Sequence, residues 1–141
     1  MSYLDLREGV GLLASPAPTQ VEWLDWLFGT MTGGGSAEGF GNYELIANFS
    51  EDVIALDYLV NIGQVTSTEA AAMRKLDDFI GSQAPYDDGF WLRRALASDE
   101  RWEQIRIRAK ATLLELPDKA SDPEWVRRFG EGGNSKAIPA G

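Results

Sequence analysis

The sequence predicts an all-α fold, a single compact bundle of about six helices. Between successive breaks, apolar residues recur at spacings of three and four, which is the period of a helix. Helix-capping patterns such as Thr66-Ser67-Thr68-Glu69 precede several of these segments. The chain has no period-two apolar run and no tight hairpin turn between alternating residues, so no β-sheet is expected. Its 141 residues fit one helical domain, 1–130, followed by a flexible tail, 131–141.

The first part of the chain divides into two predicted helices and a loop. Apolar residues share one helical face over 2–14. The capping box Thr19-Gln20-Val21-Glu22 starts a second helix, which is expected to run to about Met31. Closely spaced glycines over 33–41 then predict a loop.

The third region contains the longest apolar repeat. One helical face is formed by Leu45, Phe49, Val53, Leu56 and Val60. Ser50 is a suitable N-cap, so a helix is predicted over 51–62, while 43–49 is left open between helix and extended chain. Gly63 is expected to end this helix in the left-handed conformation.

Caps also define the helices of the second half. The Thr66 capping box starts a helix that continues to about Ile80. Asp88 is expected to cap a short helix, and Ser98 a longer one that reaches Leu116. Pro123 suits the first turn of a last, short helix.

The composition excludes several classes of function. With no histidine and no cysteine, the chain has no Ser–His–Asp or Cys–His nucleophile, no thiol redox chemistry and no Cys/His zinc site. A net charge of −9 argues against direct, non-specific binding of nucleic acid. The chain has no leader pattern and no apolar run of about 20 residues, so we expect a cytoplasmic protein without a membrane contact. No catalytic residue, metal site or cofactor is predicted.

The charge is unevenly distributed along the chain. Residues 1–63 contain nine acidic residues and one basic residue, whereas 64–141 contain thirteen acidic and twelve basic residues. The acidic excess is either a solvated face or a recognition face. In the second half, Arg106 and Lys110 are spaced as a small positive stripe, which is interpreted as part of a solvated face of mixed charge.

The predicted partner-binding surface combines acidic residues with aromatic ones. Its residues are Glu38, Phe40, Tyr43, Glu44, Glu51, Asp52, Asp57, Asp87, Asp88 and Trp91. The loop near 33–41 supplies the first two, and Trp91, next to Phe90, is expected to be an exposed aromatic anchor, because Trp is enriched in interface hot spots.

The stretch 44–116 has a further pattern. Its elements are Glu44-Leu45-Ile46-Ala47-Asn48-Phe49-Ser50-Glu51-Asp52, Gly63-Gln64-Val65-Thr66, Leu76-Asp77-Asp78-Phe79, Phe90-Trp91 with Ala95-Leu96, Trp102-Glu103-Gln104-Ile105-Arg106 and Ala109-Lys110-Ala111-Thr112-Leu113. It resembles a family of small, mostly actinobacterial proteins, some of which look like immunity proteins encoded beside secreted toxins. The resemblance implies no catalytic residue.

These observations favour a non-catalytic acidic protein that inhibits a basic, nuclease-type toxin by covering it. One alternative is an acidic decoy of a nucleic-acid-binding protein, of the kind that phages use against host defence. A second is a small hydrolase in which Asp77, Asp78, Asp87 or Asp88 holds a divalent ion, although adjacent acids on a helix diverge by about 100°. A third is a structural subunit of a larger complex.

Overall fold

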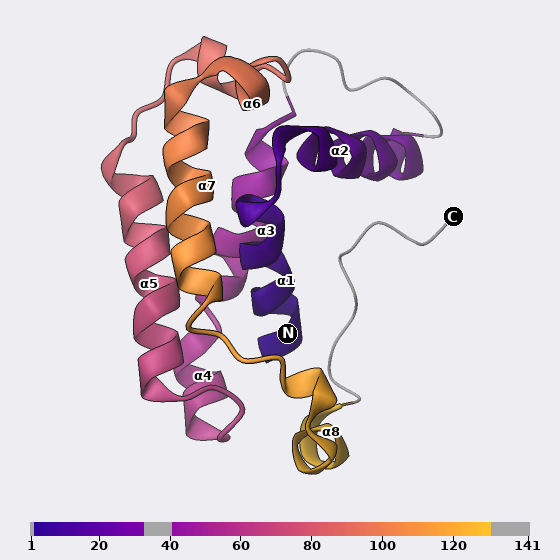
Figure 1. Ribbon diagram of the computed structural model, residues 1–141, viewed down its shortest axis with the longest axis vertical. Helices are drawn as coiled ribbons and strands as arrows, with labels where there is room; N and C mark the ends of the chain where they lie inside the picture. Colours follow the sequence, from indigo (N-terminus) through magenta and orange to yellow (C-terminus); the bar gives the residue numbers. More distant parts are fainter. Residues whose placement is uncertain (1, 33–40, 131–141) are drawn as a thin grey trace.

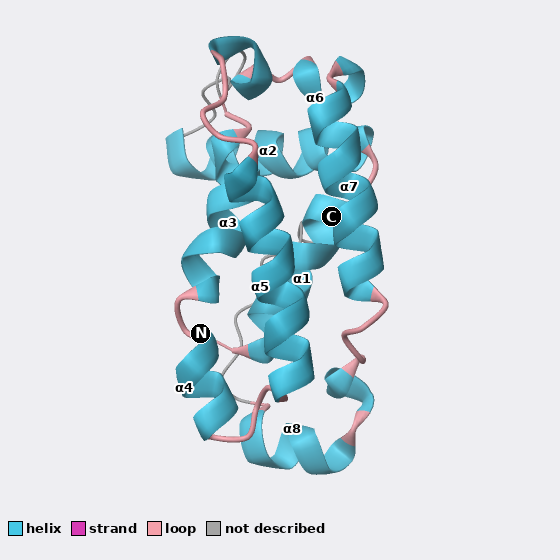
Figure 2. Cartoon of the chain, turned by 90° about the vertical axis from the view of Figure 1, so that its left-hand side faces the viewer, coloured by secondary structure: helices cyan, strands magenta, loops and turns pink. Residues whose placement is uncertain are grey.

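The computed structural model describes residues 2–32 and 41–130, and these residues form eight α-helices, two 3-10 helices and no strand (Figures 1 and 2). The elements are, in chain order, α1 (Tyr3–Ala14), α2 (Ala17–Thr32), α3 (Tyr43–Val53), α4 (Leu56–Asn61), α5 (Ser67–Ser82), η1 (Asp88–Trp91), α6 (Ala95–Ser98), α7 (Glu100–Leu113), η2 (Lys119–Ser121) and α8 (Pro123–Phe129). The all-α prediction is confirmed. The predicted tail, 131–141, and most of the predicted loop lie outside the described residues.

Helix α1 is the central helix of the bundle and packs against α7 and α3. Helix α5 packs against α7, α3 and α4, and α5 and α7 run side by side along the long axis of the molecule (Figure 1). Helix α2 crosses one end of the bundle, where it contacts α6, α1 and α3, and α8 lies at the opposite end (Figure 1). None of the described helices is both long and apolar enough to cross a bilayer.

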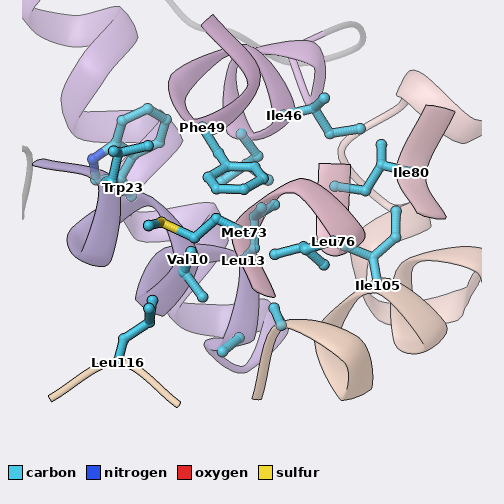
Figure 3. Close-up of a cluster of buried hydrophobic side chains, with 14 of the residues drawn as sticks. Val10, Leu13, Trp23, Ile46, Phe49, Met73, Leu76, Ile80, Ile105 and Leu116 are labelled. Atoms are coloured by element: carbon cyan, nitrogen blue, oxygen red, sulfur yellow. The ribbon is translucent and has the colours of Figure 1, made fainter. Parts of the chain in front are cut away.

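The hydrophobic core lies where α1, α3, α5 and α7 meet. Val10 and Leu13 of α1, Phe49 of α3, and Met73 and Leu76 of α5 point into one cluster (Figure 3). Each of these side chains is at most 2% exposed. Complete burial of such a side chain stabilises a fold by roughly 1.5–3 kcal/mol, so this contact holds the helices that carry the surface described below.

Helix α2 begins three residues earlier than the capping box predicted. Its first turn starts at Ala17, and the Gln20 N–H donates to the Pro16 carbonyl at 3.1 Å. Pro18 fits this first turn because proline lacks the N–H that a helix start leaves unpaired. The predicted capping box at Thr19 is therefore wrong, since Thr19 lies inside the helix.

The third region consists of two helices rather than one. Residues 43–49 are helical and belong to α3. After α3, the Ala55 N–H donates to the Asp52 carbonyl at 3.1 Å, which makes a tighter turn before α4 begins. The predicted continuous helix over 51–62 is therefore wrong. Leu56 and Leu59 of α4, which follow this turn, are both fully buried.

The predicted signals between α4 and α5 are confirmed. Gly63 has φ +80°, and the Gln64 N–H donates to the Leu59 carbonyl at 2.9 Å, as in a Schellman motif. In the capping box, the Glu69 N–H donates to Thr66 Oγ1 at 3.1 Å and the Thr66 N–H donates to Glu69 Oε1 at 2.9 Å.

Two predicted caps are displaced by one residue. Asp87, not Asp88, is the N-cap of η1. Asp99, not Ser98, caps α7. Ser98 is the last residue of α6, and its hydroxyl donates to the Arg94 carbonyl at 3.0 Å, so it is engaged in the preceding turn.

A buried polar cluster holds α8, which begins with a proline as predicted, at the end of the bundle. Lys119 Nζ donates to Glu69 Oε1 at 2.6 Å and to the Gln64 carbonyl at 2.9 Å, and it lies 3.9 Å from the centre of the Tyr3 ring. Trp125 of α8 is buried and packs edge-on against Tyr3. The cation is therefore paired in a region where an isolated charge would be costly.

Arg106 differs most clearly from its predicted environment. Its side chain is buried and donates to Gln20 Oε1 at 2.9 Å, to the Leu96 carbonyl at 2.6 Å and to Glu103 Oε2 at 3.2 Å. It thereby joins α2, α6 and α7. The prediction that Arg106 and Lys110 form a solvated stripe is wrong for Arg106, because this side of α7 faces α2 and α6.

Candidate partner-binding surface

Three open hollows surround α3, and together they form what we call the α3 surface. The first hollow is lined by Phe28, Gly41, Tyr43, Glu44 and Trp91. The second is lined by Trp23, Trp26, Leu27, Glu44, Asn48, Glu51 and Asp52. The third is lined by Ile46, Ser50, Asp77, Asp78, Ile80, Gly81, Ser82, Ala84, Tyr86 and Trp91. The hollows share residues, so the surface is continuous from α2 across α3 to α5 and η1.

A stack of aromatic rings positions Trp91 on this surface. Phe90 is fully buried between Trp102, with ring centres 4.6 Å apart, and Tyr86, with ring centres 3.9 Å apart. Trp102 Nε1 donates to the Phe90 carbonyl at 2.8 Å, and the Tyr86 hydroxyl donates to the Ile80 carbonyl at 2.6 Å. Burial raises the pKa of the Tyr86 phenol. Phe90 is thus fixed in the core, while the adjacent Trp91 remains partly exposed.

Asn42 joins the start of α3 to η1. Its buried side chain donates to the Leu92 carbonyl at 2.6 Å and to the Phe90 carbonyl at 3.3 Å. Its own N–H donates to the Trp91 carbonyl at 3.5 Å. These bonds bring Tyr43 next to Trp91, with ring centres 5.8 Å apart in an edge-to-face arrangement. The aromatic part of the α3 surface is therefore held by buried groups.

The α3 surface is acidic. Its carboxylates belong to Glu44, Glu51, Asp52, Asp77 and Asp78, and no lysine or arginine is among the described residues that line the three hollows. Asp77 accepts a hydrogen bond from Ser50 Oγ at 2.7 Å. Neither Glu44 nor Glu51 forms an ion pair within the described part of the chain. No lysine or arginine of the described residues therefore offsets the charge of these two glutamates.

Two basic residues lie in a hollow that is separate from the α3 surface. Lys75 and Arg108 line a separate hollow between α5 and α7, together with Phe79 and Glu115. The Arg108 guanidinium lies 4.3 Å from the centre of the Phe79 ring. The fold thus separates this basic hollow from the acidic surface around α3.

Five of the predicted partner-binding residues meet on the α3 surface. Tyr43, Glu44 and Trp91 line the first hollow, and Glu51 and Asp52 join Glu44 in the second. Asp52 is only 5% exposed, however, so it offers a partner less surface than its predicted position at the edge of the buried stripe implied.

The other predicted residues lie away from this surface or outside the described chain. Asp57 of α4 is paired with Arg74. Asp87 is paired with Arg101, and that hydrogen bond lowers the pKa of the Asp87 carboxyl. Asp88 lies beside Asp87 in η1, and neither lines a hollow of the α3 surface. Glu38 and Phe40 lie outside the described residues.

Sequence reasoning missed the contribution of α2 and of Asn42. Trp26 and Phe28 are half-buried and line the second and first hollows. The available signal is the run from Trp23 to Phe28, which is apolar around most of the helix, because an ordinary amphipathic helix has one apolar face. No comparable signal marks Asn42, whose partners lie about 50 residues further along the chain.

The described residues do not assemble a metal site for the predicted hydrolase alternative. Among residues 2–32 and 41–130, no group of three or more acidic, histidine or cysteine side chains is close enough to hold a metal ion. Asp77 and Asp78 are on α5, and Asp87 is held by Arg101.

Comparison with protein families, with curated proteins and with solved structures gave no match. The resemblance over 44–116 therefore stays a prediction.

Proposed function

We propose that this chain is a non-catalytic binding protein of the bacterial cytoplasm, an immunity protein that inhibits a basic, nuclease-type toxin by covering its active site. The observation that carries the proposal is the α3 surface. Partly exposed aromatic rings lie there beside Glu44 and Glu51, and no basic side chain of the described residues forms an ion pair with these two carboxylates. A nuclease must bind a polyanion, so its active site is basic and complements such a surface.

The two kinds of side chain have separate roles in this proposal. The carboxylates attract the basic partner before contact and raise the association rate, an effect that salt weakens because the Debye length is about 8 Å at physiological ionic strength. Trp91, Tyr43 and Trp26 then supply apolar contact area, which slows dissociation. No step requires a chemical reaction by this chain.

The first experiment identifies the partner and its activity. The tagged protein is purified from its native host at low salt, and each co-purifying protein is identified by mass spectrometry and produced alone. We expect a partner that cleaves nucleic acid and loses this activity when the protein is added in equimolar amount. A partner that binds nucleic acid without cleaving it supports the decoy alternative. Unchanged cleavage contradicts the proposal.

The second experiment tests the surface with matched charge changes. Glu44→Gln with Glu51→Gln removes two charges from the α3 surface, and Glu22→Gln with Glu115→Gln removes two exposed charges that line none of its hollows. Each surface charge that is lost should cost about 0–1 kcal/mol of binding free energy if it remains at the rim, and about 2–5 kcal/mol if the partner buries it.

Association kinetics across a salt series provide the readout. We expect the Glu44/Glu51 variant to associate more slowly than the Glu22/Glu115 variant and to show a weaker dependence on salt. Equal rates for the two variants would show that the acidity of this surface is not used in binding.

A further inference from the structure

We propose that the first hollow of the α3 surface receives an arginine side chain of the partner, an inference that rests on the proposed function. The hollow combines three aromatic residues with one carboxylate, that of Glu44, and its volume is about 440 Å³. Tyr43, at the edge of the hollow, is 55% exposed. Aromatic faces attract cations within about 6 Å of the ring centre, and a carboxylate beside them adds a charged acceptor.

The molecule contains the same combination of groups elsewhere, with an arginine in place. The Arg101 guanidinium lies 5.1 Å from the centre of the Phe90 ring. It donates to both oxygens of Asp99, at 3.0 and 2.7 Å, and also to Asp87. A guanidinium held by carboxylates close to an aromatic ring is therefore a combination that this chain already uses. The first hollow brings aromatic side chains and the Glu44 carboxylate together, and no cation of the described residues lines it.

Arginine fits this hollow better than lysine for geometric reasons. A planar guanidinium stacks on a ring with its face while its edge donates two hydrogen bonds to a carboxylate. An ammonium group is more strongly hydrated and cannot make both contacts with planar geometry. The rings of Tyr43 and Trp91 stand at 65° to each other, so a flat group that stacks on one of them meets the other at its edge.

The hollow is organised before a partner binds. Asn42 connects the N-terminus of α3 to η1, and the buried Phe90 fixes the backbone next to Trp91. A partner therefore meets a backbone that buried groups already hold in place. Pre-organisation of this kind reduces the entropic cost of association.

The experiment compares two peptides of equal charge, acetyl-Gly-Arg-Gly-amide and acetyl-Gly-Lys-Gly-amide, titrated at low salt and followed by two-dimensional amide NMR. We expect the arginine peptide to shift the Trp91 indole signal and the Tyr43 and Glu44 amide signals. The lysine peptide should bind at least about threefold more weakly, since it lacks the stacking contribution. Glu44→Gln and Tyr43→Ala should each weaken the arginine peptide, and Glu115→Gln should not.

The outcomes separate this inference from the proposed function. Equal affinity for the two peptides, or arginine shifts that persist in both Glu44→Gln and Tyr43→Ala, would overturn the arginine site even if the toxin is inhibited. Selective shifts at the hollow support the site even if no partner loses activity, and the proposed function then fails alone. Shifts spread evenly over all acidic residues would show charge attraction only and would also overturn the site.

Discussion

Replacement of Arg106 by methionine should destabilise the fold more than any other exchange of an arginine. Arg106 is 5% exposed and joins three helices through Gln20 of α2, Leu96 of α6 and Glu103 of its own helix. Methionine keeps the aliphatic length of the side chain, so the cavity term is small. The loss therefore comes from the hydrogen bonds and the charge.

The expected loss of unfolding free energy follows from the acceptors that lose their hydrogen-bond donor in Arg106→Met. Gln20 is fully buried, and the Leu96 carbonyl lies in an equally buried residue, so each loses its donor without access to water. An unsatisfied buried acceptor costs about 1–3 kcal/mol. The side chain of Glu103 is 48% exposed and is rehydrated easily. The two buried acceptors together therefore account for about 2–6 kcal/mol of lost unfolding free energy.

Urea unfolding followed by far-UV circular dichroism measures this loss. For a slope of about 2 kcal/mol per M, the midpoint should fall by about 2 M. Arg108→Met is the matched control, since Arg108 is exposed on the same helix and contacts Phe79 through its guanidinium; it should cost less than about 1 kcal/mol. Equal losses for the two variants, or a loss below about 1 kcal/mol for Arg106→Met, would refute the structural role of this network.

Gly63 and Asp99 control the ends of two helices. A Cβ atom at Gly63 would meet no atom within 4 Å, so Gly63→Ala should cost about 1–2 kcal/mol in urea unfolding through the positive φ alone, and no loss would contradict this. The Arg101 hydrogen bond lowers the pKa of Asp99, so its stabilisation is present above the unfolded pKa of about 3.9 and is lost as the pH falls through the lower folded value. Asp99→Asn keeps an N-cap residue. The unfolding free energy of this variant should fall less steeply between about pH 4 and 2 than that of the unaltered protein. The same slope for both proteins would contradict this prediction.

The elements that sequence predicts well depend on residues a few positions apart. The Thr66 capping box, the Gly63 turn and the start of α8 each follow from local hydrogen bonding or from the permitted φ of one residue. The break between α3 and α4 has no such signal, because Ile54 and Ala55 are ordinary helical residues. It is set by the tertiary burial of Leu56 and Leu59, which the chain alone does not reveal.

The candidate site was predictable in its chemistry but not in its extent. The acidic excess and the aromatic residues led to Tyr43, Glu44, Glu51 and Trp91, which the fold does bring to one surface. Asp57 followed from the same reasoning but is paired with an arginine 17 positions away. Long-range pairs of this kind depend on helix packing, so sequence reasoning assigned too many acids to one face.

Long-range ion pairs determine which acidic residues of the first half keep no basic partner. Arg93 and Arg74, both from the second half, neutralise Asp25 and Asp57 of the first half. If the acidic surface were only solvated, carboxylates without a basic partner would have no reason to lie close to aromatic rings. Here Glu44 lies in the same hollow as Tyr43 and Trp91, while Arg108 covers Phe79 in a different hollow. In the first hollow, the fold therefore leaves Tyr43, Trp91 and Glu44 together without a cation of the described residues, which is the arrangement that the proposed cationic partner would need.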